Sequence, residues 1–294
     1  MRYYGALEAG GTKMVLSCLD ESGAMLERLS IPTRTPAETM PEMIAFFRAH
    51  PVDALGIGCF GPLELNPGNP AFGSITATPK LAWRDYPIMR AFREALGIPV
   101  GLDTDVNGAA LAEARLGAAR GLGSCLYVTV GTGIGGGVVM GGRPVHGLVH
   151  PEFGHQLMCP AAGDPAPEGF CPYHRGCLEG LASGPAIEKR WGVSAKALPP
   201  EHPAWQVESD YLAQMCHNAI MAFSPEKIIL GGGVMQQKFL LPIIREKTLA
   251  LLGGYICAPA VDTGLADYIV EPGLGVNSGV MGAYLLAKEA LEGA

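Results

Sequence analysis

The sequence predicts an α/β protein made of two similar domains. Segments typical of strands and of helices alternate along almost the whole chain, which is the pattern of α/β architecture. A glycine turn between two apolar strands occurs twice, in residues 5–17 and in residues 122–140. The chain has 294 residues, of which 48% are hydrophobic, and this length favours about two domains with a sizeable core.

The first half of the chain opens with the first glycine hairpin and continues as alternating helices and strands. The hydrophobic and turn patterns predict a helix over 41–50, a strand over 54–59, a helix over 86–96, a buried strand over 98–102 and a helix over about 108–116. Residues 117–124 are small and flexible, so we place a domain boundary at this segment.

The second half begins with the second glycine hairpin and then passes through a long irregular stretch, 141–178, rich in Pro, Gly, His and Cys. A loop of that length is usually functional or held by something other than a core. Helices are predicted over about 185–191, 203–223, 237–252 and 278–291, with a short strand over 227–230. We expect the last helix to pack back on the first domain and tie the two at a hinge. The predicted division is therefore 1–117 plus 275–294, and 118–274.

Both glycine turns carry a threonine and are candidates for binding phosphate. The first is Gly10-Gly11-Thr12-Lys13 and the second contains Gly131-Thr132-Gly133. Glycine lets a ligand approach the backbone N–H groups closely because it has no Cβ. Neither turn is a Walker A loop or a dinucleotide fingerprint, since a strand follows each of them. One such turn alone is a weak signal, but the pair indicates a nucleotide triphosphate held between two domains.

A metal site is predicted in the irregular stretch. Cys171, His174 and Cys177 are separated by two residues each, a spacing that lets side chains converge on one tetrahedral ion, and zinc is the natural choice. His155 is the best candidate for a fourth ligand, with His150 and Cys159 as competing options. The alternative is a pair of reduced cysteines and a surface histidine with no metal.

Asp105 follows a buried strand and precedes a helix, and two roles remain open for it. It is either a helix cap, which contributes about 1 kcal/mol, or a general base at the carboxyl edge of a sheet, where α/β domains bind ligands. Asp103 is a rival two residues away. Glu152 and Glu179 flank the metal loop and are equally consistent with sugar hydroxyl binding and with surface charge. The remaining histidines are taken as structural: His50, His146, His150, His202 and His217.

Composition excludes several functions. A formal net charge of -7 argues against a nucleic-acid partner held on a basic surface. The glycines and β-branched residues of 122–142 make a membrane-spanning helix implausible, so no membrane partner is expected. The chain enters a strand directly at its start and carries eight scattered cysteines, which predicts a reduced, cytoplasmic setting.

Taken together, these segments resemble the bacterial repressor, open reading frame, kinase (ROK) family of sugar kinases, and within it the zinc-containing fructokinases. The resemblance covers essentially the whole chain. It rests on Glu-Ala-Gly-Gly-Thr-Lys at the start, Thr104-Asp105-Val-Asn107-Gly-Ala-Ala, Gly131-Thr-Gly-Ile-Gly-Gly-Gly, His150-Pro-Glu-Phe-Gly-His155, Cys171-Pro-Tyr-His174-Arg-Gly-Cys177-Leu-Glu179 and the Gly231 run. Glu8, His150-Pro151 and the Cys-x-x-His-x-x-Cys spacing depart from many relatives and are similar to the fructokinase branch.

The resemblance implies a two-lobed, actin-like (ribonuclease H-like) ATPase fold with a zinc-bound loop, ATP in the cleft and a hexose against the first lobe. Asp105 rather than Asp103 would be the base. The positions that would contact the sugar are Asn107, Glu152, His155 and Glu179, and the zinc ligands would be His155, Cys171, His174 and Cys177. The positions matching ATP contacts are Gly10, Gly11, Thr12, Lys13, Gly131, Thr132, Gly133, Pro185, Gly231, Gly232, Gly233, Val234, Met235 and Gln236.

The function implied by the resemblance is magnesium- and ATP-dependent phosphorylation of D-fructose to fructose 6-phosphate, with a structural zinc, in a homodimer. Alternatives are a kinase for mannose, glucose or an N-acetyl hexosamine, and a non-catalytic sugar sensor. The repressors of the family carry a helix-turn-helix ahead of the kinase-like part, whereas this chain starts in the first glycine hairpin, so we expect an enzyme and no nucleic-acid partner.

Overall fold

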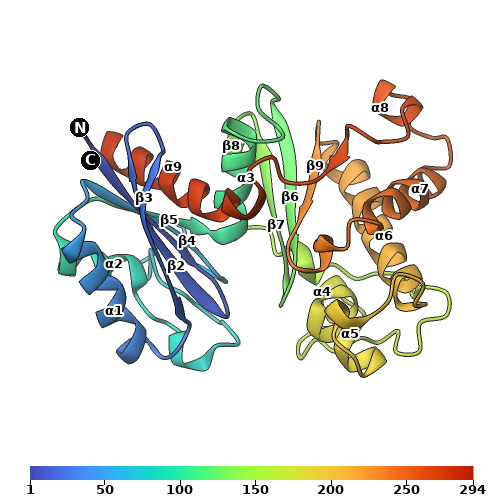
Figure 1. The fold of residues 1–294 in the computed structure, drawn as a ribbon, viewed down its shortest axis with the longest axis horizontal. Coiled ribbons are helices and arrows are strands. Elements are labelled where there is room, and N and C mark those ends of the chain that lie inside the picture. The colour runs from blue at the N-terminus through green and yellow to red at the C-terminus, as the bar shows by residue number, and fades with distance from the viewer. Residues whose placement is uncertain (294) are drawn as a thin grey trace.

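The computed structural model describes residues 1–293, and these form two five-stranded sheets built on one plan (Figure 1). The first sheet has the order β3-β2-β1-β4-β5 and the second the order β10-β9-β6-β7-β8. In each sheet an antiparallel run of three strands is followed by two parallel pairings. This repeat is the structural counterpart of the two similar glycine hairpins in the sequence.

The strands carry the glycine turns at matching ends of the two sheets. The first turn joins β1 to β2, and the second joins β6 to β7. The strands of the first sheet are β1 (Tyr3–Ala9), β2 (Lys13–Asp20), β3 (Met25–Pro32), β4 (Ala54–Cys59) and β5 (Val100–Thr104). Those of the second are β6 (Ser124–Val130), β7 (Ile134–Met140), β8 (Arg143–Pro144), β9 (Ile228–Gly231) and β10 (Ile269–Val270).

Helices cover both faces of both sheets. The helices α1 (Pro36–Ala49) and α2 (Ile88–Leu96) lie beside the first sheet, and α6 (Ala204–Phe223) and α7 (Leu240–Leu252) lie beside the second (Figure 1). Helix α3 (Asp105–Arg115) lies between the sheets and packs on β6 and β7 as well as on β4 and β5. The shorter helices are α4 (Leu178–Ala182), α5 (Gly184–Trp191) and α8 (Pro259–Asp262).

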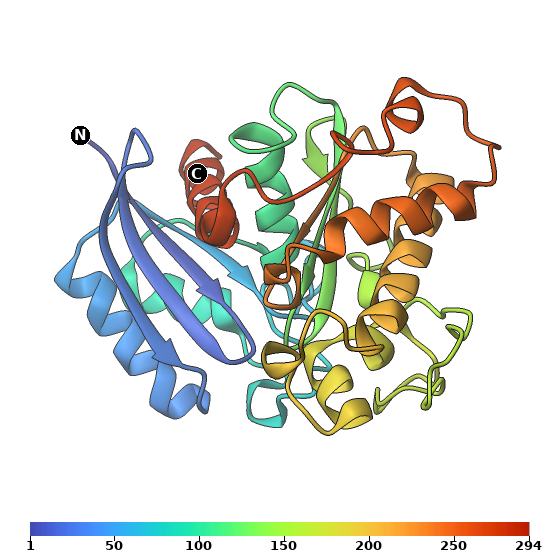
Figure 2. The same cartoon turned by 45° about the vertical axis from the view of Figure 1, so that its right-hand side comes forward.

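The last helix, α9 (Ser278–Glu292), returns to the first sheet, as the sequence predicts (Figure 2). It packs on β1, β4, β5 and α3. The approach is close because two strand residues facing it are glycines. A Cβ on Gly101 would lie 2.5 Å from the carbonyl oxygen of Leu286, and one on Gly56 would overlap the carbonyl of Ala283. The C-terminal helix is therefore an integral layer of the N-terminal sheet.

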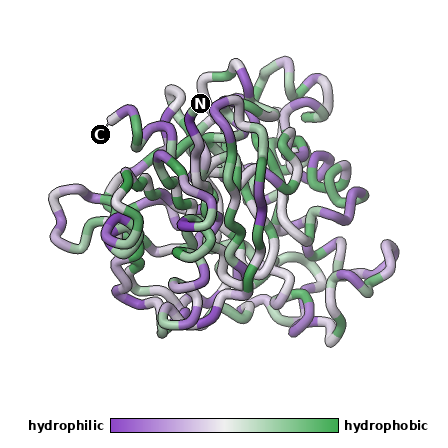
Figure 3. Tube along the Cα trace, turned by 60° about the vertical axis from the view of Figure 1, so that its left-hand side comes forward, coloured by the Kyte–Doolittle hydropathy of each residue, from purple (hydrophilic) through white to green (hydrophobic). Residues whose placement is uncertain are grey.

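Side chains alternate between two apolar layers along the central strands. In β1, Leu7 and Ala9 belong to the cluster beneath α1 and α2, while Tyr4 and Ala6 face α9 and α3. The central strands are accordingly rich in hydrophobic residues, and many of the hydrophilic segments lie toward the outside of the molecule (Figure 3). Among the described residues, the structure holds no helix long and apolar enough to span a bilayer.

Several elements differ from the sequence predictions: β5 covers Val100–Thr104 and not 98–102, α3 begins at Asp105 and not at about 108, and α7 begins at Leu240 and not at 237. Helix α1 begins at Pro36, five positions before the predicted start at Pro41, because Thr35 and Glu38 form a capping box and Pro36 fits the first turn. Pro41 lies inside the helix and lacks one backbone donor. Strand β3 was not predicted, since all but one of its side chains are exposed and it shows no apolar alternation.

Candidate functional site

The first glycine turn is held from one side by the end of β3. The Gly10 amide donates to the carbonyl of Lys13 at 3.0 Å, and the Thr33 hydroxyl donates to the carbonyl of Gly10 at 2.7 Å. Thr12 and Lys13 are exposed, and the two glycines are half-buried. The turn therefore presents its outer edge to a ligand while its inner edge is fixed.

The second glycine turn lies beside the third glycine run. The Gly131 amide donates to the carbonyl of Gly133 at 2.9 Å, and the Gly184 amide donates to the carbonyl of Gly131 at 2.8 Å. Gly232 has a φ of +94°, and a Cβ there would collide with the backbone of Val130. Only glycine allows this approach of β9 to the end of β6. The structure thus places 131–133 and 231–233 side by side.

A cavity of about 130 Å³ opens beside the second turn and reaches the metal loop. Its lining includes Thr132, Ser183, Pro185 and Lys189, together with Phe170 of the loop. Two of the predicted ATP positions, Val234 and Met235, have buried side chains that belong to the core of the second sheet. Any contact from these two residues would be made by their backbone.

Asp105 is the first residue of α3, at the carboxyl end of β5, and is not the cap of that helix. The Thr104 hydroxyl fills the capping position, accepting the Asn107 amide hydrogen at 3.1 Å. The Asp105 carboxylate is half-buried and, within residues 1–293, accepts the amide hydrogen of Val106 at 2.9 Å. Burial raises its pKa from the ordinary 3.8 to about 6. The capping interpretation of Asp105 is wrong, and its carboxylate remains available for chemistry.

Three more carboxyl groups lie near Asp105 or the second glycine turn. Burial, followed by the charge of Asp105, raises the pKa of Glu8. Partial burial and the charges of Glu179 and Asp105 raise the pKa of Glu152 to about 7, although 42% of its side chain remains exposed. One Glu179 oxygen accepts the Ile134 amide hydrogen at 3.0 Å, directly beside the second glycine turn. The site therefore combines several carboxyl groups, which can accept hydrogen bonds, with glycine turns whose backbone amides can donate them.

Asn107 and Asp103 form a buried pair behind Asp105. The Asn107 side-chain amide donates to Asp103 Oδ1 at 2.8 Å, and its own Oδ1 is buried without a partner among the described residues. His146 Nε2 lies 3.0 Å from Asp103 Oδ2, and this contact raises the pKa of His146. Asn107 is only 1% exposed. A direct contact between Asn107 and a sugar stays a prediction.

The sequence shows no partners for His146 and His150, but His146 ties the 145–152 loop to Asp103 of β5 and His150 ties it to Leu63, which follows β4. His150 is buried, and its Nε2 accepts the Leu63 amide hydrogen at 2.9 Å, while its Nδ1 lies 3.5 Å from Glu152 Oε1. These partners are separated by 43 residues for His146 and 87 for His150. No local spacing signal could have revealed them.

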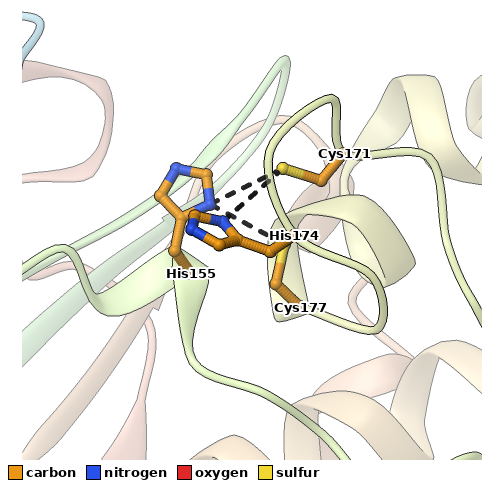
Figure 4. Close-up of side chains that lie close together, drawn as sticks. All are labelled: His155, Cys171, His174 and Cys177. Carbon is orange, nitrogen blue, oxygen red and sulfur yellow. Dashed lines mark hydrogen bonds between the residues drawn. The ribbon is translucent and has the colours of Figure 1, made fainter. Parts of the chain in front are cut away.

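The four predicted metal ligands converge in one cluster (Figure 4). Their ligand atoms all lie within 4.8 Å of one another. His155 Nδ1 is 3.9 Å from Cys171 Sγ and 3.7 Å from Cys177 Sγ, and His174 Nδ1 is 3.9 Å from Cys171 Sγ. A tetrahedral zinc with usual bond lengths needs sulfur–nitrogen edges of about 3.5 Å. The donor set and its spacing therefore fit a closed zinc site.

The competing ligands lie outside the cluster. His150 accepts the Leu63 amide, and the exposed Cys159 lies outside the cluster, with its amide donating to Gln214 Oε1 at 3.0 Å. His155 has a second possible role, since its Nε2 is 3.9 Å from Glu179 Oε1. One imidazole thus faces the cysteines with one nitrogen and Glu179 with the other.

Comparison with known proteins agrees with this geometry. The family model described as "ROK family" matches residues 4–290. The chain is 47% identical over 290 residues to a fructokinase of Pediococcus pentosaceus, covering 99% of both chains. It is 43% identical over 300 residues to a fructokinase of Zymomonas mobilis, covering 98% of this chain and 97% of the relative.

The solved structure of a ROK hexokinase from Thermus thermophilus superposes with a TM-score of 0.77 at 32% identity, covering 99% of this chain and all of the other. This match confirms the two-lobed, actin-like ATPase fold that the motifs predicted. Family model, relatives and structure agree over nearly the full length. The chain belongs to the ROK family of sugar kinases and related proteins.

Proposed function

We propose that this protein is an ATP-dependent fructokinase that phosphorylates the 6-hydroxyl of D-fructose. The observation that carries the proposal is the half-buried carboxylate of Asp105, whose pKa is raised to about 6 at the sheet edge that also holds the first glycine turn. The chain is 47% and 43% identical in sequence to two proteins named fructokinase, and this similarity supports fructose as the sugar.

The reaction divides between the two lobes, for which we propose the ranges 1–117 plus 275–294, and 118–274. Asp105 takes the proton of the sugar hydroxyl, whose oxygen forms a bond to the γ-phosphorus. The bond from that phosphorus to the β,γ-bridging oxygen breaks, and ADP leaves with the electron pair. Magnesium bound to the nucleotide would neutralise phosphate charge. Positioning and electrostatics supply most of the rate because the transition state is loose.

The remaining predicted residues bind the two substrates. Asn107, Glu152, His155 and Glu179 hold sugar hydroxyls. The nucleotide phosphates lie on the two glycine turns, and Pro185, with residues 231–236, lines the rest of its site. In this proposal zinc, held by His155, Cys171, His174 and Cys177, fixes the loop that carries His155 and Glu179.

Oligomeric state and location follow the same proposal. We propose a homodimer, which sedimentation analysis would test directly. A cytoplasmic location is supported by the eight cysteines, none of which forms a disulfide in the described part of the chain. The thiolates of the metal cluster likewise require a reducing setting.

The test is magnesium-dependent ADP release with ATP and a panel of fructose, mannose, glucose, N-acetylglucosamine and N-acetylmannosamine, compared by kcat/KM. Fructose is expected to dominate. Asp105→Asn is the matched inactive control, expected to lose at least about 10²-fold in kcat while still binding sugar and nucleotide. A higher kcat/KM for another hexose would show that this hexose, and not fructose, is the preferred substrate. Near-normal turnover by Asp105→Asn would show that Asp105 is not the general base.

A further inference from the structure

Lys80 lies directly against the first glycine turn. A Cβ built on Gly11 would be 3.2 Å from Lys80 Cε and 4.0 Å from its Nζ, so the lysine occupies the space that a larger residue at position 11 would need. Lys80 is half-buried, and no carboxylate of residues 1–293 lies within ion-pair distance of its ammonium group. An unpaired cation in this position is free to meet a ligand.

The turn itself offers open donors beside this ammonium group. The Gly10 amide donates to the carbonyl of Lys13, but the amides of Gly11 and Thr12 have no acceptor within the described part of the chain. Two free backbone N–H groups next to an unpaired ammonium group form a site for an anion with several oxygens.

The base of Lys80 is anchored to the same frame as the turn. Its amide donates to Thr78 Oγ1 at 3.3 Å, and its carbonyl accepts the Trp83 amide at 2.8 Å. Trp83 is 1% exposed and donates its indole N–H to the carbonyl of Arg34 at 2.6 Å. Arg34 directly follows Thr33, which bonds the turn. The lysine and the turn therefore move together as parts of one lobe.

We propose that Lys80 binds the terminal phosphoryl group of ATP and stabilises it during transfer. This inference rests on the proposed kinase function and adds a residue to it. Lys80 belongs to the segment between β4 and α2, on the lobe that carries Asp105, whereas the 130 Å³ cavity and the second glycine turn belong to the other sheet. A cation on the lobe that binds the sugar is placed to contact the phosphoryl group that is transferred. The bonds that form and break are those of the proposed reaction.

The experiment compares Lys80→Met, Lys80→Arg and the control Arg84→Met. Arg84 is an exposed cation four positions away that makes no side-chain hydrogen bond or ion pair within residues 1–293. Binding of magnesium-AMPPNP and of magnesium-ADP is measured by calorimetry, and kcat and KM are measured for ATP and fructose. Melting temperature reports folding in each variant.

Lys80→Met is expected to lower kcat/KM for ATP about 10²-fold and to weaken AMPPNP binding, with ADP affinity and the KM for fructose within about twofold of wild type. Lys80→Arg should recover part of the loss, and Arg84→Met should match wild type. Unchanged AMPPNP affinity and kcat in a folded Lys80→Met would overturn the inference, as would an equal loss of ADP and AMPPNP affinity. A wild-type protein that does not phosphorylate fructose would refute the proposed function. The role of Lys80 would still be decided by AMPPNP binding, because this binding needs no sugar.

Discussion

Burial of the single Asp105 carboxyl group is expected to influence both the rate and the stability of this protein. Below about pH 6 the carboxyl keeps its own proton and cannot accept one from a sugar hydroxyl. We expect kcat, measured with saturating ATP and fructose, to fall about tenfold per pH unit below that point and to level off above it. A kcat that stays flat down to about pH 5 would contradict the base assignment.

The same carboxyl weakens the fold at neutral pH. Its pKa is raised from 3.8 to about 6 on folding, so the folded state loses free energy of unfolding as pH rises between these values and stays lower above them. Asp105→Asn cannot ionise and should be at least as stable as wild type near pH 7.5, by up to about 2 kcal/mol in urea unfolding. Destabilisation by more than about 1 kcal/mol would show that the carboxylate also has a structural role.

The residues of the site differ in how far sequence could predict them. Asp105 follows a strand and precedes a helix, a pattern that is visible in the chain, but Asp103 shares it. The two are separated only in three dimensions, where Asp103 is held by Asn107 and His146 while Asp105 stays free. Lys80 carries no motif at all, and only its contact with Gly11 distinguishes it from a surface lysine.

At the scale of elements, the loop that carries Cys171, His174 and Cys177 is the segment that zinc would hold in the proposed function. Removing zinc with a chelator, or replacing Cys177 by Ser, should lower the melting temperature and raise the KM for fructose together, because His155 and Glu179 lose their support. Differential scanning fluorimetry with metal analysis and kinetics measures both effects.

Cys159→Ser is the matched control for this loop, since Cys159 is exposed and lies outside the metal cluster. It should keep the zinc content, melting temperature and KM of wild type. Zinc added back to chelated wild-type protein should restore all three. Full activity and stability in a metal-free preparation would refute the structural role of zinc.

The predicted elements succeed where periodicity is strong and fail at edges. The strand over 54–59 has the predicted bounds because every one of its side chains is buried. Strand β3 is not predicted because it is an exposed edge strand. Helix α1 begins before its predicted start because Thr35 and Glu38 form a capping box at its N-terminus. The cysteine spacing predicts this cluster because Cys171, His174 and Cys177 are close together in the sequence. The fourth member, His155, lies 16 positions before Cys171.

At the scale of the whole molecule, Glu113 joins both segments that pass between the sheets. This buried carboxylate accepts the Ala118 and Gly273 amides at 2.7 and 2.9 Å with one oxygen. Its other oxygen accepts the Leu274 amide at 3.0 Å and the Ser278 hydroxyl at 2.7 Å. One side chain therefore satisfies donors from both crossings.

Glu113→Gln is expected to lower the free energy of unfolding by about 3 kcal/mol, because the amide cannot accept two of these four hydrogen bonds and places an N–H₂ against two donors. Urea unfolding measures the loss. Glu289→Gln, which removes an exposed ion pair with Arg115, should change stability by less than about 1 kcal/mol. Equal effects from the two substitutions would show that Glu113 is not a special link.

The return of α9 to the first sheet has a consequence for the order of synthesis. Strands β1 to β5 are made before α9, yet α9 (residues 278–292) forms part of the layer that buries one of their faces. Tyr4, Ala6 and Val15 lack that part of their apolar cover until α9 has been made. The second sheet, encoded without interruption, can close earlier, so the half of the protein that is made first is the half that is finished last.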